Sequence, residues 1–165
     1  MASRRKSRER ALQVLFLVDL RKQEIEEAMQ AFSYTLHAED EDFSNMARDK
    51  FMEHLVRGTI ARQEQLDQQI VQASENWRLD RMPTVDRNIL RLATFELLEA
   101  KLPHAVIIDE ALELARKFSG NESVGFVNGV LDAVSGALRK QAARPPEEAA
   151  EEVKAMAAGV PESEA

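Results

Sequence analysis

The fold is decided by the stretch PTVDRNILRLATFELL, residues 83–98, in which apolar residues recur at helical spacing. Its opening proline is followed by Thr84, a residue type that caps helix starts, and Asp86 falls in the first turn. The residues that trace one face are Val85, Ile89, Leu92, Ala93 and Leu97. Glu96 lies on the same stripe, so we expect it to meet a partner side chain or to lie at an edge. The stretch predicts an amphipathic helix.

The segments before this stretch show the same helical period. Residues 7–20 and 24–37 each predict a helix, and Ser7 is a candidate cap for the first. A further apolar stripe runs from Phe43 to Ile70 and predicts one long helix or two abutting ones, with Gly58 as the joint.

Helical patterns also follow the central stretch. Residues 104–118 predict a helix that Gly120 closes, and either Asn121 or Ser123 can cap the last one. The run VII could form a short strand, but no other segment offers it a partner strand. The sequence therefore predicts an all-α protein with a compact domain of six or seven helices over residues 1–140.

Composition excludes several functional classes. The 165 residues include no Cys and only three His, none of them spaced as a helical metal pair. GNESVG lacks the Lys-Ser/Thr of a phosphate-binding loop, and no strand precedes it. No apolar run is long enough to span a membrane. We therefore expect a cytoplasmic protein that is not an enzyme and has no cofactor or metal.

Charge is distributed unevenly along a chain whose net charge is −7. Residues 1–10 carry five cations against one glutamate, whereas residues 141–165 carry six glutamates against two cations. This pattern is typical of a basic arm and an acidic tail, and we expect the tail to be disordered.

Two glycines interrupt the last predicted helix in ESVGFVNGVLD, residues 122–132. Gly125 and Gly129 lie four residues apart and so share a face, which allows close approach of another backbone or a ligand. We expect close helix packing at Gly129. Gly125 falls in the first turn near Phe126, whose ring belongs either to the core or to a stacking surface for an unpaired base.

The chain resembles the NusB family. The segments that carry this resemblance, in order across roughly residues 4–140, are SRERALQVLFLVDL, PTVDRNILRLATFELL, PHAVIIDEALELARKF and FVNGVLD. The acidic tail lies outside the family pattern. The resemblance implies two small helical bundles without enzymatic activity, which bind the boxA element of nascent ribosomal RNA together with the ribosomal protein called NusE. Other Nus factors and RNA polymerase then join, and premature termination is suppressed.

The resemblance also assigns roles to individual residues. The family's basic N-terminal arm matches Arg4, Arg5, Arg8 and Arg10, and its first-helix aromatic falls at Phe16, where some relatives have Tyr. Glu122 and Phe126 match RNA-binding positions at the start of the last helix. Asp86 matches an acidic position that binds RNA or the partner. Carboxylates there could accept hydrogen bonds from base amino groups or contact a basic partner.

Two other functional classes remain open at this point. A NusB-like domain also occurs fused to ribosomal RNA methyltransferases, but the residues after 140 are too few for a cofactor-binding fold. A helical protein-interaction scaffold without specific RNA binding is the other alternative. The sequence also leaves open whether the protein forms a homodimer, which RNA sequence it prefers, and what the tail does.

Overall fold

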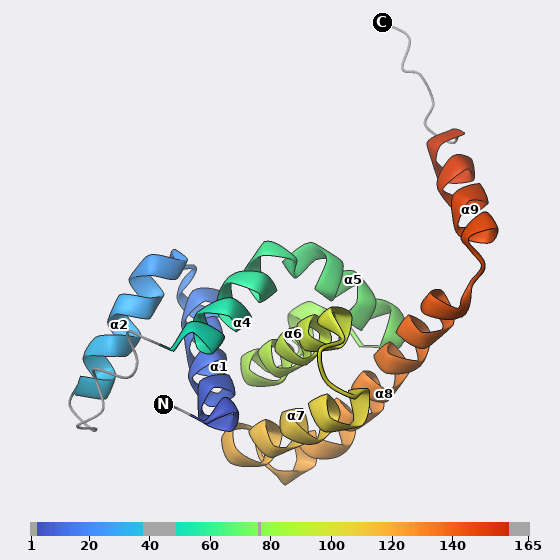
Figure 1. Ribbon diagram of the computed structural model, residues 1–165. Coiled ribbons are helices and arrows are strands. Elements are labelled where there is room, and N and C mark those ends of the chain that lie inside the picture. The colour runs from blue at the N-terminus through green and yellow to red at the C-terminus, as the bar shows by residue number, and fades with distance from the viewer. Residues whose placement is uncertain (1–2, 38–48, 76, 159–165) are drawn as a thin grey trace, which may run out of the picture.

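The computed structural model describes residues 3–37, 49–75 and 77–158 (Figure 1). Every regular element in these ranges is helical, which confirms the predicted all-α class. The elements are α1 (Arg4–Arg21), α2 (Ile25–His37), α4 (Lys50–Ala61), α5 (Gln63–Ala73), the short 3-10 helix η1 (Leu79–Arg81), α6 (Thr84–Glu99), α7 (His104–Phe118), α8 (Asn121–Ala143) and α9 (Pro146–Ala158). Seven of these α-helices precede residue 144, in agreement with the prediction.

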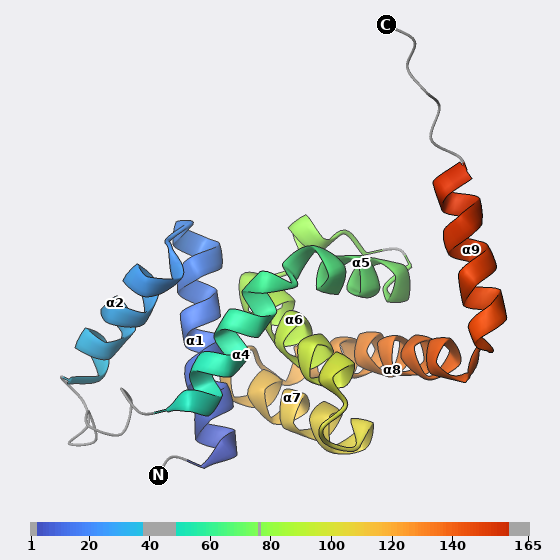
Figure 2. The same ribbon diagram turned by 45° about the horizontal axis from the view of Figure 1, so that its top comes forward.

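Helix α6 is the centre of the domain. It contacts α1, α4, α5, α7 and α8, and all its residues from Asn88 to Leu97 are buried. A helix whose residues are buried on every face must be surrounded by other helices. Helices α1, α2 and α4 lie on one side of it, and α5, α7 and α8 on the other (Figures 1 and 2). The two groups share one continuous hydrophobic core.

The first helix begins earlier than the sequence suggested. The side chain of Ser3 caps α1 by accepting a hydrogen bond from the Lys6 N–H, and Arg4 is the first helical residue. Ser7 is therefore not the cap, and its buried hydroxyl instead donates to Asp49. Residues 4–10 of the predicted basic arm form the first turns of α1.

The predicted caps of the later helices also differ from the structure. Pro83 occupies the cap position of α6, and Thr84 is its first helical residue. Gly120 precedes α8 with a φ of 123°, so neither Asn121 nor Ser123 is its cap. Gly120 does close α7 as predicted, because its N–H donates to the carbonyl of Ala115.

Gly58 is not the joint of the α4–α5 segment. The break comes at Arg62, and Gly58 lies inside α4 against the ring of Phe95. A Cβ at Gly58 would lie 2.9 Å from Cε1 of Phe95 and closer still to two other ring atoms. The glycine thus allows α4 to approach α6. The predicted start of this stripe at Phe43 lies outside the described residues.

Gly125 and Gly129 face open space. Both are exposed, and a Cβ at either would have no neighbour within 4 Å. The predicted close packing at Gly129 is therefore wrong, because the apolar face of α8 turns Val127, Val130 and Leu131 inward instead.

The acidic segment after Ala143 is separate from the bundle, as expected, but residues 146–158 form α9. This helix points away from the bundle (Figure 2). Its Glu- and Ala-rich sequence favours helix, and Pro146 suits a first helical position. In the parts of the chain that the structure describes, no helix is both long and apolar enough to cross a membrane.

Candidate nucleic-acid interface

Three exposed cations lie in the first turn of α1. The Arg5 guanidinium donates from Nε and Nη2 to both carboxylate oxygens of Glu110 on α7, at 3.1 and 3.0 Å. Arg4 stacks over the Phe51 ring at 4.0 Å, and Lys6 lies 3.7 Å from Glu9. Exposed ion pairs of this kind contribute little, because water screens them. Arg5 and Lys6 can therefore exchange their carboxylates for phosphates at little cost.

Arg8 and Arg10 point into the protein instead. The Arg8 guanidinium donates to both oxygens of Glu96, the closest at 2.8 Å, and only 4% of its side chain is exposed. The predicted partner of Glu96 is therefore Arg8. Arg10 lies 3.2 Å from Asp49, whose carboxylate also accepts from the Met52 N–H at the start of α4. Both arginines hold helices together, and their predicted contacts with RNA would require these pairs to open.

The junction between α7 and α8 is tied to the start of α6 by Asp86. This carboxylate is 3% exposed and accepts hydrogen bonds from the hydroxyls of Ser119 and Ser123, the latter at 2.9 Å. The two hydroxyls also contact each other at 2.8 Å. Because its two oxygens are engaged, Asp86 positions the junction in this structure. Direct contact of Asp86 with RNA or a partner stays a prediction.

An ion pair joins the start of α1 to this junction. Lys117, at the end of α7, lies 2.9 Å from Glu9 of α1. Its ammonium also lies 5.5 Å from the ring centre of Phe118. Glu9, which also lies 3.7 Å from Lys6, thus links the first turns of α1 to the end of α7, just before the junction.

An aromatic pair lies next to the junction. Phe126, half-buried on α8, packs against Trp77 with ring centres 5.0 Å apart and planes at 56°. Glu122 is exposed in the first turn of α8. Phe16 is half-buried on α1. The predicted RNA contacts of Glu122, Phe126 and Phe16 are consistent with exposed or partly exposed positions, but stay predictions.

Trp77 is the residue that sequence reasoning missed. Its side chain is 57% exposed even though it covers Phe126. The signal available in the sequence was that the single Trp lies among charged residues, in ENWRLDR, and outside any apolar stripe.

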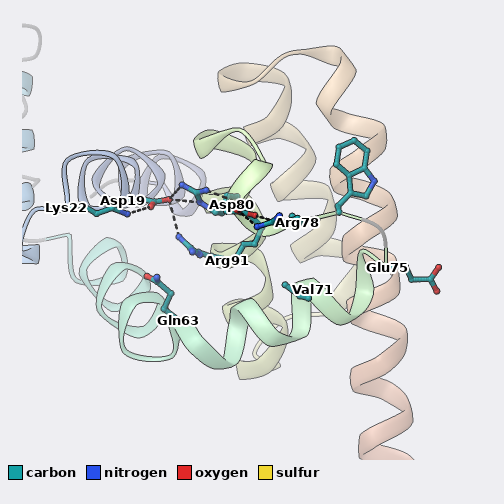
Figure 3. Close-up of a pocket in the computed structure, with 11 residues that line it drawn as sticks. Asp19, Lys22, Gln63, Val71, Glu75, Arg78, Asp80 and Arg91 are labelled. Atoms are coloured by element: carbon teal, nitrogen blue, oxygen red, sulfur yellow. Dashed lines mark hydrogen bonds and ion pairs between the residues drawn. The ribbon is translucent and has the colours of Figure 1, made fainter.

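Trp77 also borders a cavity of about 620 Å³ between the end of α1, α5, η1 and α6 (Figure 3). Asp19 forms its floor and accepts hydrogen bonds on Oδ2 from Arg87, Asn88 and Arg91, at 2.8, 3.0 and 3.2 Å. Arg91 in turn binds Asp67 through two hydrogen bonds. Burial by itself raises the pKa of Asp19, but the hydrogen bonds from Arg87 and Asn88 and the nearby guanidinium charges outweigh it and lower the pKa.

This network predicts a loss of stability in acid. Because the folded pKa of Asp19 lies below its unfolded value of about 3.9, the unfolded state binds more protons as the pH falls. The contribution of Asp19 is complete above about pH 5 and is lost as the pH falls through the folded pKa. We expect Asp19→Asn to lower the free energy of unfolding at pH 7 by about 1–3 kcal/mol and to flatten its decline below pH 5. Urea unfolding across this pH range measures both effects, and Asp132→Asn, exposed on α8, is the control. Parallel pH curves for wild type and Asp19→Asn would contradict the assignment.

Comparison with known proteins shows the family to which this chain belongs. The sequence model of the NusB family matches residues 5–136. A transcription antitermination protein NusB from Solibacter usitatus is 54% identical over 134 residues, which cover 81% of this chain and 89% of the relative. Among solved structures, NusB from T. maritima is 31% identical with a TM-score of 0.69, covering 91% of this chain and 98% of that one. A complex of the antitermination factors NusB and NusE with double-stranded RNA has a TM-score of 0.68 at 27% identity, covering 81% of this chain and 96% of that one. This chain belongs to the NusB family.

Proposed function

We propose that this protein is a cytoplasmic transcription antitermination factor, which binds boxA RNA of ribosomal RNA leaders together with the ribosomal protein NusE. In this assembly it would help RNA polymerase to resist premature termination, alongside other Nus factors. The antitermination role of the relatives supports the role, and the NusB–NusE–RNA complex among the structural neighbours supports the two partners. The protein acts by binding, without chemistry of its own.

The observation that carries the proposal is the ion pair between Glu9 and Lys117. It ties the first turns of α1, which carry the exposed cations, to the end of α7, and the junction with Glu122 and Phe126 follows directly in the chain. A single strand crossing this surface would meet cations for its phosphates first, and then an aromatic ring and a carboxylate for its bases. The cations supply attraction that is independent of sequence, and the groups at the junction supply selectivity.

The structure divides the predicted arginines into two pairs. Arg4 and Arg5, with Lys6 beside them, are exposed and can neutralise phosphates, whereas Arg8 and Arg10 hold buried carboxylates. Three phosphate contacts on a single strand give a slope of about −2 for the logarithm of the binding constant against the logarithm of salt concentration. Contacts by all four predicted arginines would give a slope nearer about −3.

The decisive experiment measures binding of a short single-stranded boxA RNA and of a scrambled RNA, with and without NusE. We expect a preference for boxA that becomes stronger with NusE. We expect the triple variant Arg4→Gln, Arg5→Gln and Lys6→Gln to bind roughly tenfold or more weakly and to show little remaining salt dependence. The matched control removes three exposed cations at the far end of α8, with Arg139→Gln, Lys140→Gln and Arg144→Gln, and should bind almost as wild type.

Two results would count against the proposal. Equal, weak binding to both RNAs would favour the protein-interaction scaffold, for which the net charge of −7 is a supporting observation. Equal losses in the two triple variants would show that the start of α1 is not a specific site. Asp86→Asn tests the junction separately: unchanged binding of both RNA and NusE would show that Asp86 contributes neither a contact nor the positioning of Glu122.

A further inference from the structure

The charged side chains at the floor of the cavity beside Trp77 already neutralise one another. Asp19 balances the charges of Arg87 and Arg91, and Asp67 provides a second carboxylate for Arg91. Each of these side chains is at least three-quarters buried. A free phosphate or other anion would therefore find no uncompensated positive charge at the floor. A neutral, flat ligand with polar edges fits this floor better.

The rim of the cavity differs from the floor. Lys22, whose side chain is 82% exposed, stands at the end of α1, and Arg78 on the facing segment pairs with Asp80 at the surface (Figure 3). Val71 of α5 is 46% exposed and Trp77 is 57% exposed. The rim thus combines an aromatic and an aliphatic side chain with two exposed cations, Lys22 beside Asp19 and Arg78 beside Asp80, and Glu75 adds a further carboxylate. Single-stranded nucleic acid binds to surfaces of this kind, because bases stack on aromatics while phosphates meet cations.

Trp77 connects this cavity with the surface proposed to bind RNA. Its ring packs at an angle of 56° against Phe126, and the residue is still 57% exposed, so part of the ring is open to a further group. Trp77 therefore adjoins both Phe126 and the cavity. The volume of about 620 Å³ lies within the range of ordinary small-ligand pockets.

We propose that this cavity receives an unpaired base of the bound RNA, which stacks on Trp77 while Lys22 contacts the adjoining phosphate. This inference rests on the proposed function, because it extends the same RNA past Phe126. Gln63 lines the cavity and provides an amide that can both donate to and accept from a base edge.

The chain itself provides the probe, because Trp77 is its only tryptophan. Its fluorescence is recorded while a short single-stranded boxA RNA is added to the full-length protein, in the presence of NusE from which any tryptophan has been replaced. A series of RNAs, each abasic at one nucleotide, is then compared with the intact RNA. We expect the intact RNA to quench the emission and one abasic position to abolish the quenching. That abasic position should also weaken binding about 5- to 150-fold, the range for loss of one stacked base.

Variants then test whether the base and Trp77 act together. Trp77→Ala should weaken binding of the intact RNA by the same factor as removal of the critical base weakens binding to the wild-type protein. Trp77→Ala should then bind the RNA that lacks this base with little further loss of affinity. Trp77→Phe keeps an aromatic face and should retain most of the affinity. Lys22→Gln should reduce the salt slope by about 0.7. Tyr34→Ala, which removes a 75% exposed aromatic on α2, is the matched control.

The outcomes separate this inference from the proposed function. Specific boxA binding without quenching, and with no abasic position coupled to Trp77→Ala, overturns the base site and leaves the function standing. The base site is also overturned if Trp77→Ala weakens the binding of every abasic RNA by the same factor. Trp77 would then act only by supporting Phe126. Absence of boxA binding overturns both proposals.

Discussion

Replacing Arg8 with Met is expected to lower the free energy of unfolding by about 3–5 kcal/mol, because it leaves the Glu96 carboxylate buried without its partner. The two side chains are 4% and 9% exposed and meet through three hydrogen bonds, so the carboxylate loses both its counter-charge and these hydrogen bonds. For a chain of this size the midpoint temperature should fall by roughly 10–15 °C. Thermal and urea unfolding followed by circular dichroism measure the change.

Two further variants show whether the buried pair is the cause. Arg5→Met removes the exposed pair with Glu110 and should cost far less than Arg8→Met, because water screens that pair. Adding Glu96→Leu to Arg8→Met removes the stranded charge and should restore most of the stability. If Arg8→Met instead proves almost as stable as wild type and loses RNA binding, Arg8 is an RNA contact and its structural role is wrong.

Gly58→Ala is expected to destabilise the protein by about 1–3 kcal/mol, even though alanine is the better helix former by about 1 kcal/mol. The added methyl would overlap the ring of Phe95, which is 2% exposed and lies among the largest buried side chains. An aromatic ring is rigid and cannot bend away from the methyl as the end of a flexible side chain can. Either α4 must therefore move away from α6, or the ring must leave its position. Urea unfolding of the purified variant measures the loss.

Gly129→Ala is the matched control for this substitution. It makes the same chemical change in the interior of a helix, but the new methyl meets open space. Gly129→Ala should therefore stabilise the protein by about 0.5–1 kcal/mol. Adding Phe95→Leu to Gly58→Ala should cost less than the two single losses together, because each change then relieves the other. Equal effects of alanine at the two glycines would contradict the close approach of α4 to α6.

Local sequence determined the helices of this protein. The apolar period that runs from Val85 to Leu97 predicts α6, and Gly120 marks the end of α7, because periodicity and backbone freedom act over a few residues. The same reasoning anticipated that Glu96, on an otherwise apolar face, would meet a partner or lie at an edge, and the structure shows the partner. The resemblance to the NusB family also came from the sequence alone, and the comparisons confirm it.

Only the tertiary structure decided which charges face inward. Arg4, Arg5, Arg8 and Arg10 look alike in a basic run, but a helix turns its residues by about 100° each, so neighbours in sequence face different surroundings. Arg8 meets a carboxylate 88 residues away, and no local pattern specifies that distance. Likewise, Gly58 lies against Phe95 whereas Gly129 faces open space, and only the packing of α4 and α8 beside α6 decides this difference. The cavity at Trp77 is built from four separate segments, and so it exists only once those segments have packed together.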